Sequence, residues 1–271
     1  MIHPRQILPV TALVLVFIAF SALPEEKKSV VVTTSMLECA AREVLPTSES
    51  IEIIRLLPPA ACPGHFDLSP RIIPKLHSAV LVLRHDYQDI LDKKLSDMGA
   101  TNISMIEISS TGSPLIPVYY YKIVEEVGSK FAQTFPGNHS DIQNRGKTVK
   151  KRVNELTLRI NKTAARWKGK PVIAALHQKE FCEWLGFEVT GELKRPEDTS
   201  PRDLEKLLSV KAEIVVANFQ EGVQSANSLG ERKNIPVAVL SNFPGVENFG
   251  ENYYRLIETN ITRLEETWQK R

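Results

Sequence analysis

Hydrophobic residues occur along this chain in two alternating patterns. Short continuous runs rich in Val and Ile are typical of strands buried on both faces, and longer stretches with an apolar residue every three or four positions are typical of amphipathic helices. The runs predict strands at residues 29–34, 51–57, 79–83, 103–108, 171–176, 187–190, 213–217 and 235–240. The periodic stretches predict helices at 36–44, 70–76, 87–98, 117–135, 141–167, 179–185, 202–208 and 249–269. This alternation indicates parallel sheets covered by helices.

The stretch 141–167 divides the chain into two halves with similar patterns. Its apolar residues lie on one helix face; they are Val149, Val153, Leu156, Ile160, Ala164 and Trp167. The opposite face is rich in Lys and Arg, which we expect to be solvated rather than to bind an anionic surface. The predicted fold class is α/β, with two β/α lobes that have mainly parallel sheets and are joined by one long rigid helix. The predicted boundaries are 28–137 for the N-terminal lobe, 138–168 for the linking helix and 169–271 for the C-terminal lobe.

The first 23 residues follow a different pattern, that of a secretory signal. An apolar run from Ile7 to Leu23 precedes the charged segment Glu-Glu-Lys-Lys, and small residues around Ser21 suit cleavage there. An uncleaved membrane anchor is the alternative, because the run is only just long enough to span a bilayer. Either way, the rest of the chain is expected to be periplasmic or otherwise extracytoplasmic.

Composition and charge exclude some classes of protein. The chain has 271 residues, 42% of them hydrophobic, and a formal net charge of +2, so a nucleic-acid partner is not expected. Its 3 cysteines are too few for a disulfide framework. An exported location permits a Cys39–Cys62 disulfide, and three buried free thiols are the alternative.

Polar residues follow the predicted strands, and three of the 6 histidines are among them. In open α/β sheets, ligands bind outside the carboxyl ends of the strands. His65, His85 and His177 follow strand ends from both halves of the chain, and Gln220 and Glu221 follow another. Imidazole is a ligand of zinc, copper, nickel and iron, whereas manganese usually takes more carboxylates. The pattern therefore predicts a metal site between the two lobes.

Four segments carry a resemblance to a known family, and one of them, 75–82, resembles its helix-to-strand segment after the signature loop. The run LPPAACPGHFDLSP at 57–70 resembles the signature loop of periplasmic solute-binding proteins that serve zinc and manganese ABC importers. The segment 172–186, with its His and LGF, resembles the part of that family that bears another ligand histidine, and 249–264 resembles its closing helix. The long helix at 141–167 falls where the family has its helix between lobes. The similarity covers nearly all of residues 29–271.

The resemblance implies both a function and a ligand set. A receptor of this family captures a divalent metal ion, zinc first and manganese or another transition metal as the alternative, and hands it to an ABC permease in the cytoplasmic membrane. It works as a monomer and carries out no catalysis. His65 and His177 match family ligands.

The chain also departs from the family at two ligand positions. Residues 112–116 lack the second family histidine, and Asn218 and Ser241–Asn242 occupy places where the family usually has an acidic residue. We expect His85 to replace the missing histidine. Glu221 is expected to supply the acidic ligand, with Gln220 or water as the alternative.

These departures leave two other functions open. The chain could have lost metal and bind another ligand or a partner. It could also be an envelope metallohydrolase with Glu221 or Asp67 as the base, although the sequence has no His-Glu-x-x-His motif.

Overall fold

Two separate sheets of four parallel strands form the framework, as a computed structural model shows for residues 28–46, 51–63, 69–99, 103 and 105–271. The first sheet has the order β2-β1-β3-β4, with β1 (Lys28–Val32), β2 (Ile51–Arg55), β3 (Ala79–His85) and β4 (Met105–Ile108). The second has the order β6-β5-β7-β8, with β5 (Pro171–Ala175), β6 (Glu188–Leu193), β7 (Ile214–Asn218) and β8 (Val237–Leu240). We call the parts built around them the N-terminal and C-terminal lobes. The predicted α/β class with two parallel sheets is confirmed.

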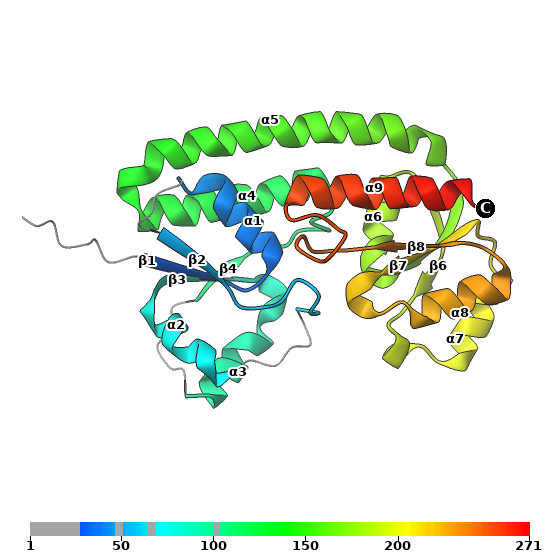
Figure 1. Cartoon of the computed structure of the whole chain (residues 1–271), viewed down its shortest axis with the longest axis horizontal. Coiled ribbons are helices and arrows are strands. Elements are labelled where there is room, and N and C mark those ends of the chain that lie inside the picture. The colour runs from blue at the N-terminus through cyan, green and yellow to red at the C-terminus, as the bar shows by residue number, and fades with distance from the viewer. Residues whose placement is uncertain (1–27, 47–50, 64–68, 100–102, 104) are drawn as a thin grey trace, which may run out of the picture.

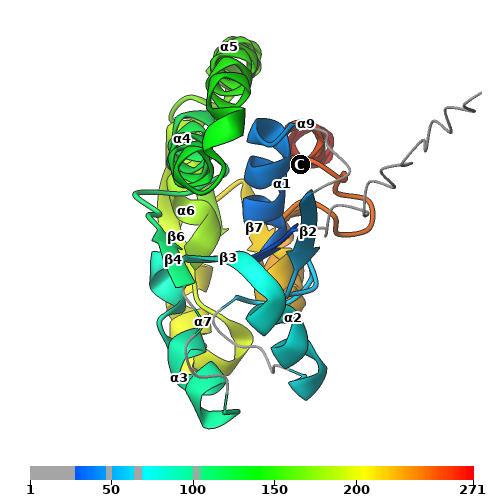
Figure 2. The same ribbon diagram turned by 90° about the vertical axis from the view of Figure 1, so that its left-hand side faces the viewer.

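Helices cover both faces of each sheet. In the N-terminal lobe α1 (Ser35–Val44) and α4 (Pro117–Thr134) lie on one face, and α2 (Ile73–Ser78) and α3 (Ile90–Asp97) lie on the other (Figures 1 and 2). In the C-terminal lobe α6 (Lys179–Trp184) and α9 (Tyr253–Gln269) face α7 (Pro201–Ser209) and α8 (Gln224–Lys233) across the sheet (Figure 1). Local signals start several of them: Thr34 caps α1, and Ser200 and Asp203 form a capping box at α7.

The long helix α5 (His139–Ala164) extends over both lobes (Figure 1). Its buried residues include five of those that predicted this face, from Val149 to Ala164, and Trp167 follows in a short 3-10 turn. The basic residues on its other side are exposed, as expected, and three of them also pair with acidic residues of other helices. Arg152 pairs with Glu43 of α1 at 2.9 Å, and Arg159 and Arg166 pair with Glu258 and Glu265 of α9.

The main apolar core continues from one lobe into the other. Tyr253, the first residue of α9, lies against Tyr120 of α4, and its hydroxyl donates a hydrogen bond to the carbonyl of Leu115. The last helix of the chain therefore packs against the N-terminal lobe as well as its own.

Several details differ from the prediction. Strand β3 continues to His85 instead of ending at residue 83, and β6 continues to Leu193 instead of ending at 190. Helix α8 was not predicted, because its sequence QSANSLGERK has too few apolar residues for a helical period. None of the three cysteines is in a disulfide, so the Cys39–Cys62 disulfide is not formed. Cys182 is fully buried, whereas Cys39 and Cys62 are partly buried, so the alternative of three buried thiols holds in full only for Cys182.

Whether the N-terminal segment is a cleaved signal or a membrane anchor depends on residues that the structure does not describe. Within the described ranges, none of the helices is both long and apolar enough to cross a bilayer. The predicted signal segment, residues 1–23, lies outside those ranges.

Candidate metal centre

His177 and Glu221 meet at the carboxyl ends of two neighbouring strands. His177 lies in a short 3-10 turn directly after β5, and Glu221 lies in the matching turn after β7. The Nδ1–H of His177 donates a hydrogen bond to Oε1 of Glu221. The imidazole is 48% exposed, whereas the carboxylate is 5% exposed. Metal-bound histidines commonly donate their second ring N–H to a carboxylate, which fixes the ring and its tautomer.

Arg195 joins this pair to the N-terminal lobe. Its Nε lies 3.7 Å from Oε1 of Glu221, and its Nη2 donates a hydrogen bond to the sulfur of Cys62 at 3.5 Å. Cys62 comes three residues before His65 in the chain. The segment that leads to His65 is therefore held next to the His177–Glu221 pair.

A group of amide side chains forms further contacts near the His177–Glu221 pair, one of them between the two lobes. Gln220 Nε2 donates to the carbonyl of Pro59 at 3.2 Å and to the hydroxyl of Ser241 at 2.8 Å. Its oxygen accepts from the backbone N–H of Asn242, and the side chain of Asn242 accepts from Gln178. Gln220 thus uses both ends of its amide to connect loops, which is a structural role.

The position of the missing family acid is also filled by a structural amide. Asn218 is 1% exposed, and its oxygen accepts a hydrogen bond from the backbone N–H of Gln220. This bond shapes the turn that carries Glu221. The Asn218 amide nitrogen is buried without a hydrogen-bond partner in the described part of the chain.

His85 is buried in the N-terminal lobe. Its Nε2 lies 2.9 Å from the hydroxyl of Thr34, its Nδ1 lies 3.1 Å from that of Ser110, and its ring stacks on Tyr87. Burial lowers the pKa of His85 to about 4, so the ring is neutral at pH 7. Both ring nitrogens of His85 are thus engaged by the hydroxyls of Thr34 and Ser110.

The candidate residues are thus brought together only in part. Within the described ranges, no three His, Cys, Asp or Glu residues are close enough together to hold a metal ion. His177 and Glu221 are in contact, and His85 is not part of a cluster with them. His65 and Asp67 lie outside the described residues.

Sequence reasoning missed Arg195. The residue follows β6 at the same sheet edge as His177 and Glu221, so the strand-end rule would have selected it if the strand had been predicted to its full length. The predicted strand stopped at Thr190 because Gly191 interrupts the apolar run.

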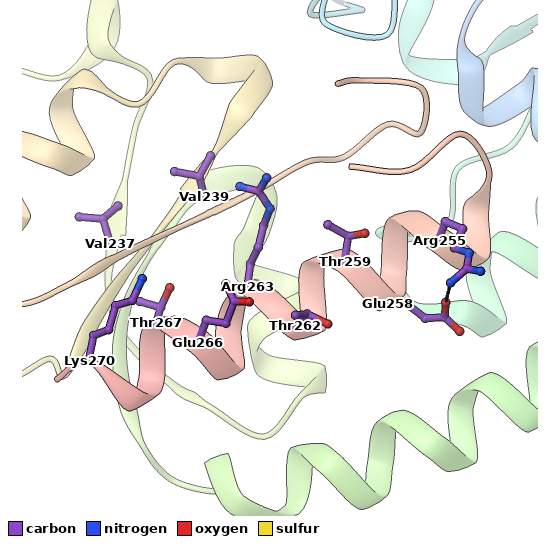
Figure 3. A pocket seen from close by; sticks show the side chains of 10 residues that line it. All are labelled: Val237, Val239, Arg255, Glu258, Thr259, Thr262, Arg263, Glu266, Thr267 and Lys270. Carbon is purple, nitrogen blue, oxygen red and sulfur yellow. Dashed lines mark hydrogen bonds and ion pairs between the residues drawn. The ribbon is translucent and has the colours of Figure 1, made fainter. Parts of the chain in front are cut away.

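A groove of about 610 Å³ lies elsewhere, between α9 and β8 (Figure 3). Threonine and charged side chains of α9 line it, together with Val237 and Val239. None of its described lining residues is a candidate ligand, so it is distinct from the candidate metal centre.

Solved structures define the class of fold. The chain resembles a manganese-bound periplasmic metal-binding protein from Candidatus Liberibacter asiaticus, with a TM-score of 0.73 and 13% identity over 89% of this chain and 100% of the other. A cadmium-bound structure of that organism's protein gives the same values. The laminin-binding protein Lbp of Streptococcus pyogenes matches with a TM-score of 0.72 and 14% identity over 90% of this chain and 99% of the other. The chain therefore has the two-lobe fold of these proteins.

The family follows from the sequence. The model of the family described as zinc-uptake complex component A, periplasmic, matches residues 30–267, so the chain belongs to that family. This confirms the resemblance drawn from the sequence, and the family is one of periplasmic metal-binding receptors of ABC importers rather than of enzymes. No curated protein sequence matches the chain.

Proposed function

We propose that this chain is an exported receptor that captures a divalent transition-metal ion, zinc in the first place, and delivers it to an ABC permease. The ion is cargo, held and released without chemical change. We propose further that the receptor acts as a monomer and that its metal site lies where the two lobes face each other.

The His177–Glu221 pair is the observation that carries this proposal. An exposed imidazole beside a nearly buried carboxylate is an arrangement suited to a metal ligand, since the carboxylate fixes the Nδ1–H tautomer and leaves Nε2 as the electron-pair donor. In the described structure, Nε2 of His177 has no hydrogen-bond partner.

The contacts of Cys62 and Pro59 support His65 as a second ligand. Both residues are held against the C-terminal lobe by Arg195 and Gln220. His65 follows Cys62 by three residues in the sequence, so the proposal takes it as the second ligand. Glu221 is proposed as the acidic ligand or as the residue that orients His177.

The donor set favours zinc over manganese. Two imidazoles and one carboxylate suit zinc, whereas manganese prefers a site with more oxygen ligands. The positions where the family usually adds an acid are amides here, and these amides are engaged in hydrogen bonds. With three protein ligands, water would complete a tetrahedral zinc site.

Zinc titration of the purified protein tests the proposal. Zinc at 1,000 times its Kd is expected to raise the free energy of unfolding by about 4 kcal/mol, which a thermal melt detects. His177→Ala and His65→Ala should each weaken zinc binding at least about tenfold, since each removes a ligand. His139→Ala is the matched control, because His139 is an exposed histidine of α5 that is hydrogen-bonded to Gln143 of the same helix.

A receptor that has lost metal is the second candidate. The observation that favours it is the amide character of the lobe interface: Asn218 and Asn242 stand where the resemblance led us to expect an acid, and both are engaged in hydrogen bonds, Asn242 with Gln178. If zinc, manganese and cadmium all leave the melting temperature unchanged, the metal-receptor proposal fails and this candidate replaces it. If the double variant H65A/H177A binds zinc as well as the wild type does, the proposed metal site is wrong.

A further inference from the structure

Arg195 places a positive charge inside the candidate metal centre. Its side chain is 17% exposed and lies between the carboxylate of Glu221 and the thiol of Cys62. Lys194, the residue before it, points its ammonium toward Asp203 instead, at 4.0 Å. Arg195 is therefore the cation of this loop that pairs with Glu221.

The pairing with Arg195 compensates the buried negative charge of Glu221. A carboxylate that is 5% exposed needs a nearby positive charge, because removing an unpaired charge from water is costly. His177 donates a hydrogen bond to this carboxylate, and Arg195 supplies a permanent positive charge. Both interact with Oε1, whereas Oε2 of Glu221 is buried and has no hydrogen-bond partner among the described residues.

A divalent ion at His177 and Glu221 would compete with this arginine. Two cations close to one buried carboxylate repel each other, and the repulsion is weakly screened away from water. Arginine stays charged at all physiological pH values, so the repulsion that Arg195 exerts on a metal ion persists throughout that range.

We propose that Arg195 is a resident counter-cation of Glu221, which stabilises the empty site and which an incoming metal ion has to displace. This inference rests on the proposed function. As a consequence, Arg195 lowers the affinity of the site for the metal ion. Arg195 pairs with Glu221 again when the ion leaves, and this favours release of the ion to the permease. Arg195 is a positioning residue in this scheme, since it acts on the metal through Glu221.

The test compares three variants with the wild type. Arg195→Met keeps most of the side-chain volume and removes the charge, Arg195→Lys keeps the charge, and Arg232→Met removes a comparable cation from an exposed pair with Glu205 in the same lobe. Two quantities are measured for each: the Kd for zinc, by competition with a chromogenic chelator, and the melting temperature of the metal-free protein.

The expected result is opposite changes in the two quantities. R195M should bind zinc about tenfold or more tightly than the wild type, because a repulsive charge is gone, and its metal-free form should melt at a lower temperature, because Glu221 has lost its counter-charge. R195K should stay closer to the wild type in both, and R232M should match the wild type. A residue that merely supports the fold would, when replaced, weaken zinc binding.

Each outcome separates this inference from the proposed function. If the wild type binds zinc and R195M binds it equally or less tightly, the inference is overturned and the proposed function stands. If only R195M binds zinc, the inference is supported, and the wild-type site is one that Arg195 keeps closed to metal. If neither protein binds zinc, both are overturned.

Discussion

Tyr253 stacks on Tyr120 with the ring centroids 3.6 Å apart and the planes within 7° of parallel. The two rings belong to different lobes and are both fully buried. Their contact joins the last helix of the chain to the core of the N-terminal lobe, and it predicts that the two lobes unfold together.

Replacing Tyr253 tests this coupling. Tyr253→Ala should lower the free energy of unfolding by about 3–5 kcal/mol, because it leaves a cavity in the core that the lobes share. Tyr253→Phe should cost only about 1 kcal/mol, since it removes the hydrogen bond to the carbonyl of Leu115 and keeps the ring. Urea denaturation followed by far-UV circular dichroism measures both. Two separate transitions in the wild type would contradict the single cooperative structure.

His85 predicts how stability depends on pH. Its folded-state pKa of about 4 is below the ordinary value of 6.5, so between these two pH values the unfolded chain binds a proton that the native state does not. The stability of the native state is therefore unaffected by this group above pH 6.5 and falls as the pH drops toward 4. The loss reaches about 3 kcal/mol near pH 4.

The variant His85→Gln isolates the contribution of His85 to the pH dependence of stability. Glutamine can still hydrogen-bond to the hydroxyls of Thr34 and Ser110 but does not titrate. Urea midpoints at pH 7 and pH 4.5 should therefore differ less for the variant than for the wild type. An identical pH dependence in the two proteins would show that other groups cause the acid instability.

Glu221 should affect metal binding more than it affects folding. Glu221→Gln keeps the size of the side chain and can still accept from His177 Nδ1, but it lacks the charge. The Kd for zinc should rise by about 10–100-fold, as for other residues that orient a metal-bound histidine. Competition titration with a chelator checks this, and a Kd equal to that of the wild type would exclude Glu221 from the metal centre.

The reactivity of the three thiols tests how deeply each cysteine is buried and whether any of them is in a disulfide. Burial raises the pKa of Cys39 to about 12 and that of Cys182 still further, so both remain thiols and react slowly at pH 8. In the native protein, Cys62 is expected to react first with a disulfide reagent, and all three should react in urea because none is in a disulfide. A count of fewer than three in urea would reveal a disulfide.

The sequence predicted the framework because strands buried on both faces and a regular helix face leave clear patterns. It placed His177 and Glu221 at strand ends, and the parallel register of β5 and β7 brings them into contact. It also placed His85 at a strand end, but strand position does not determine which way a ring packs, and here Thr34 and Ser110 bind both nitrogens. Arg195 was missed because the predicted strand stopped at Thr190, before Gly191, whereas β6 continues to Leu193 and so brings Arg195 to the same sheet edge. Its contact with Cys62, 133 residues away in the sequence, is not encoded by any local pattern.

The position of α9 has a consequence for the order of events when the protein is made. A chain that emerges N-terminus first, from a ribosome or an export channel, exposes Tyr120 and its neighbours in α4 long before Tyr253 arrives to cover them. The N-terminal lobe therefore has an unfinished core until the last twenty residues are free. We expect folding to be completed only after the whole chain has emerged, which keeps the chain in a form that can still be threaded across a membrane.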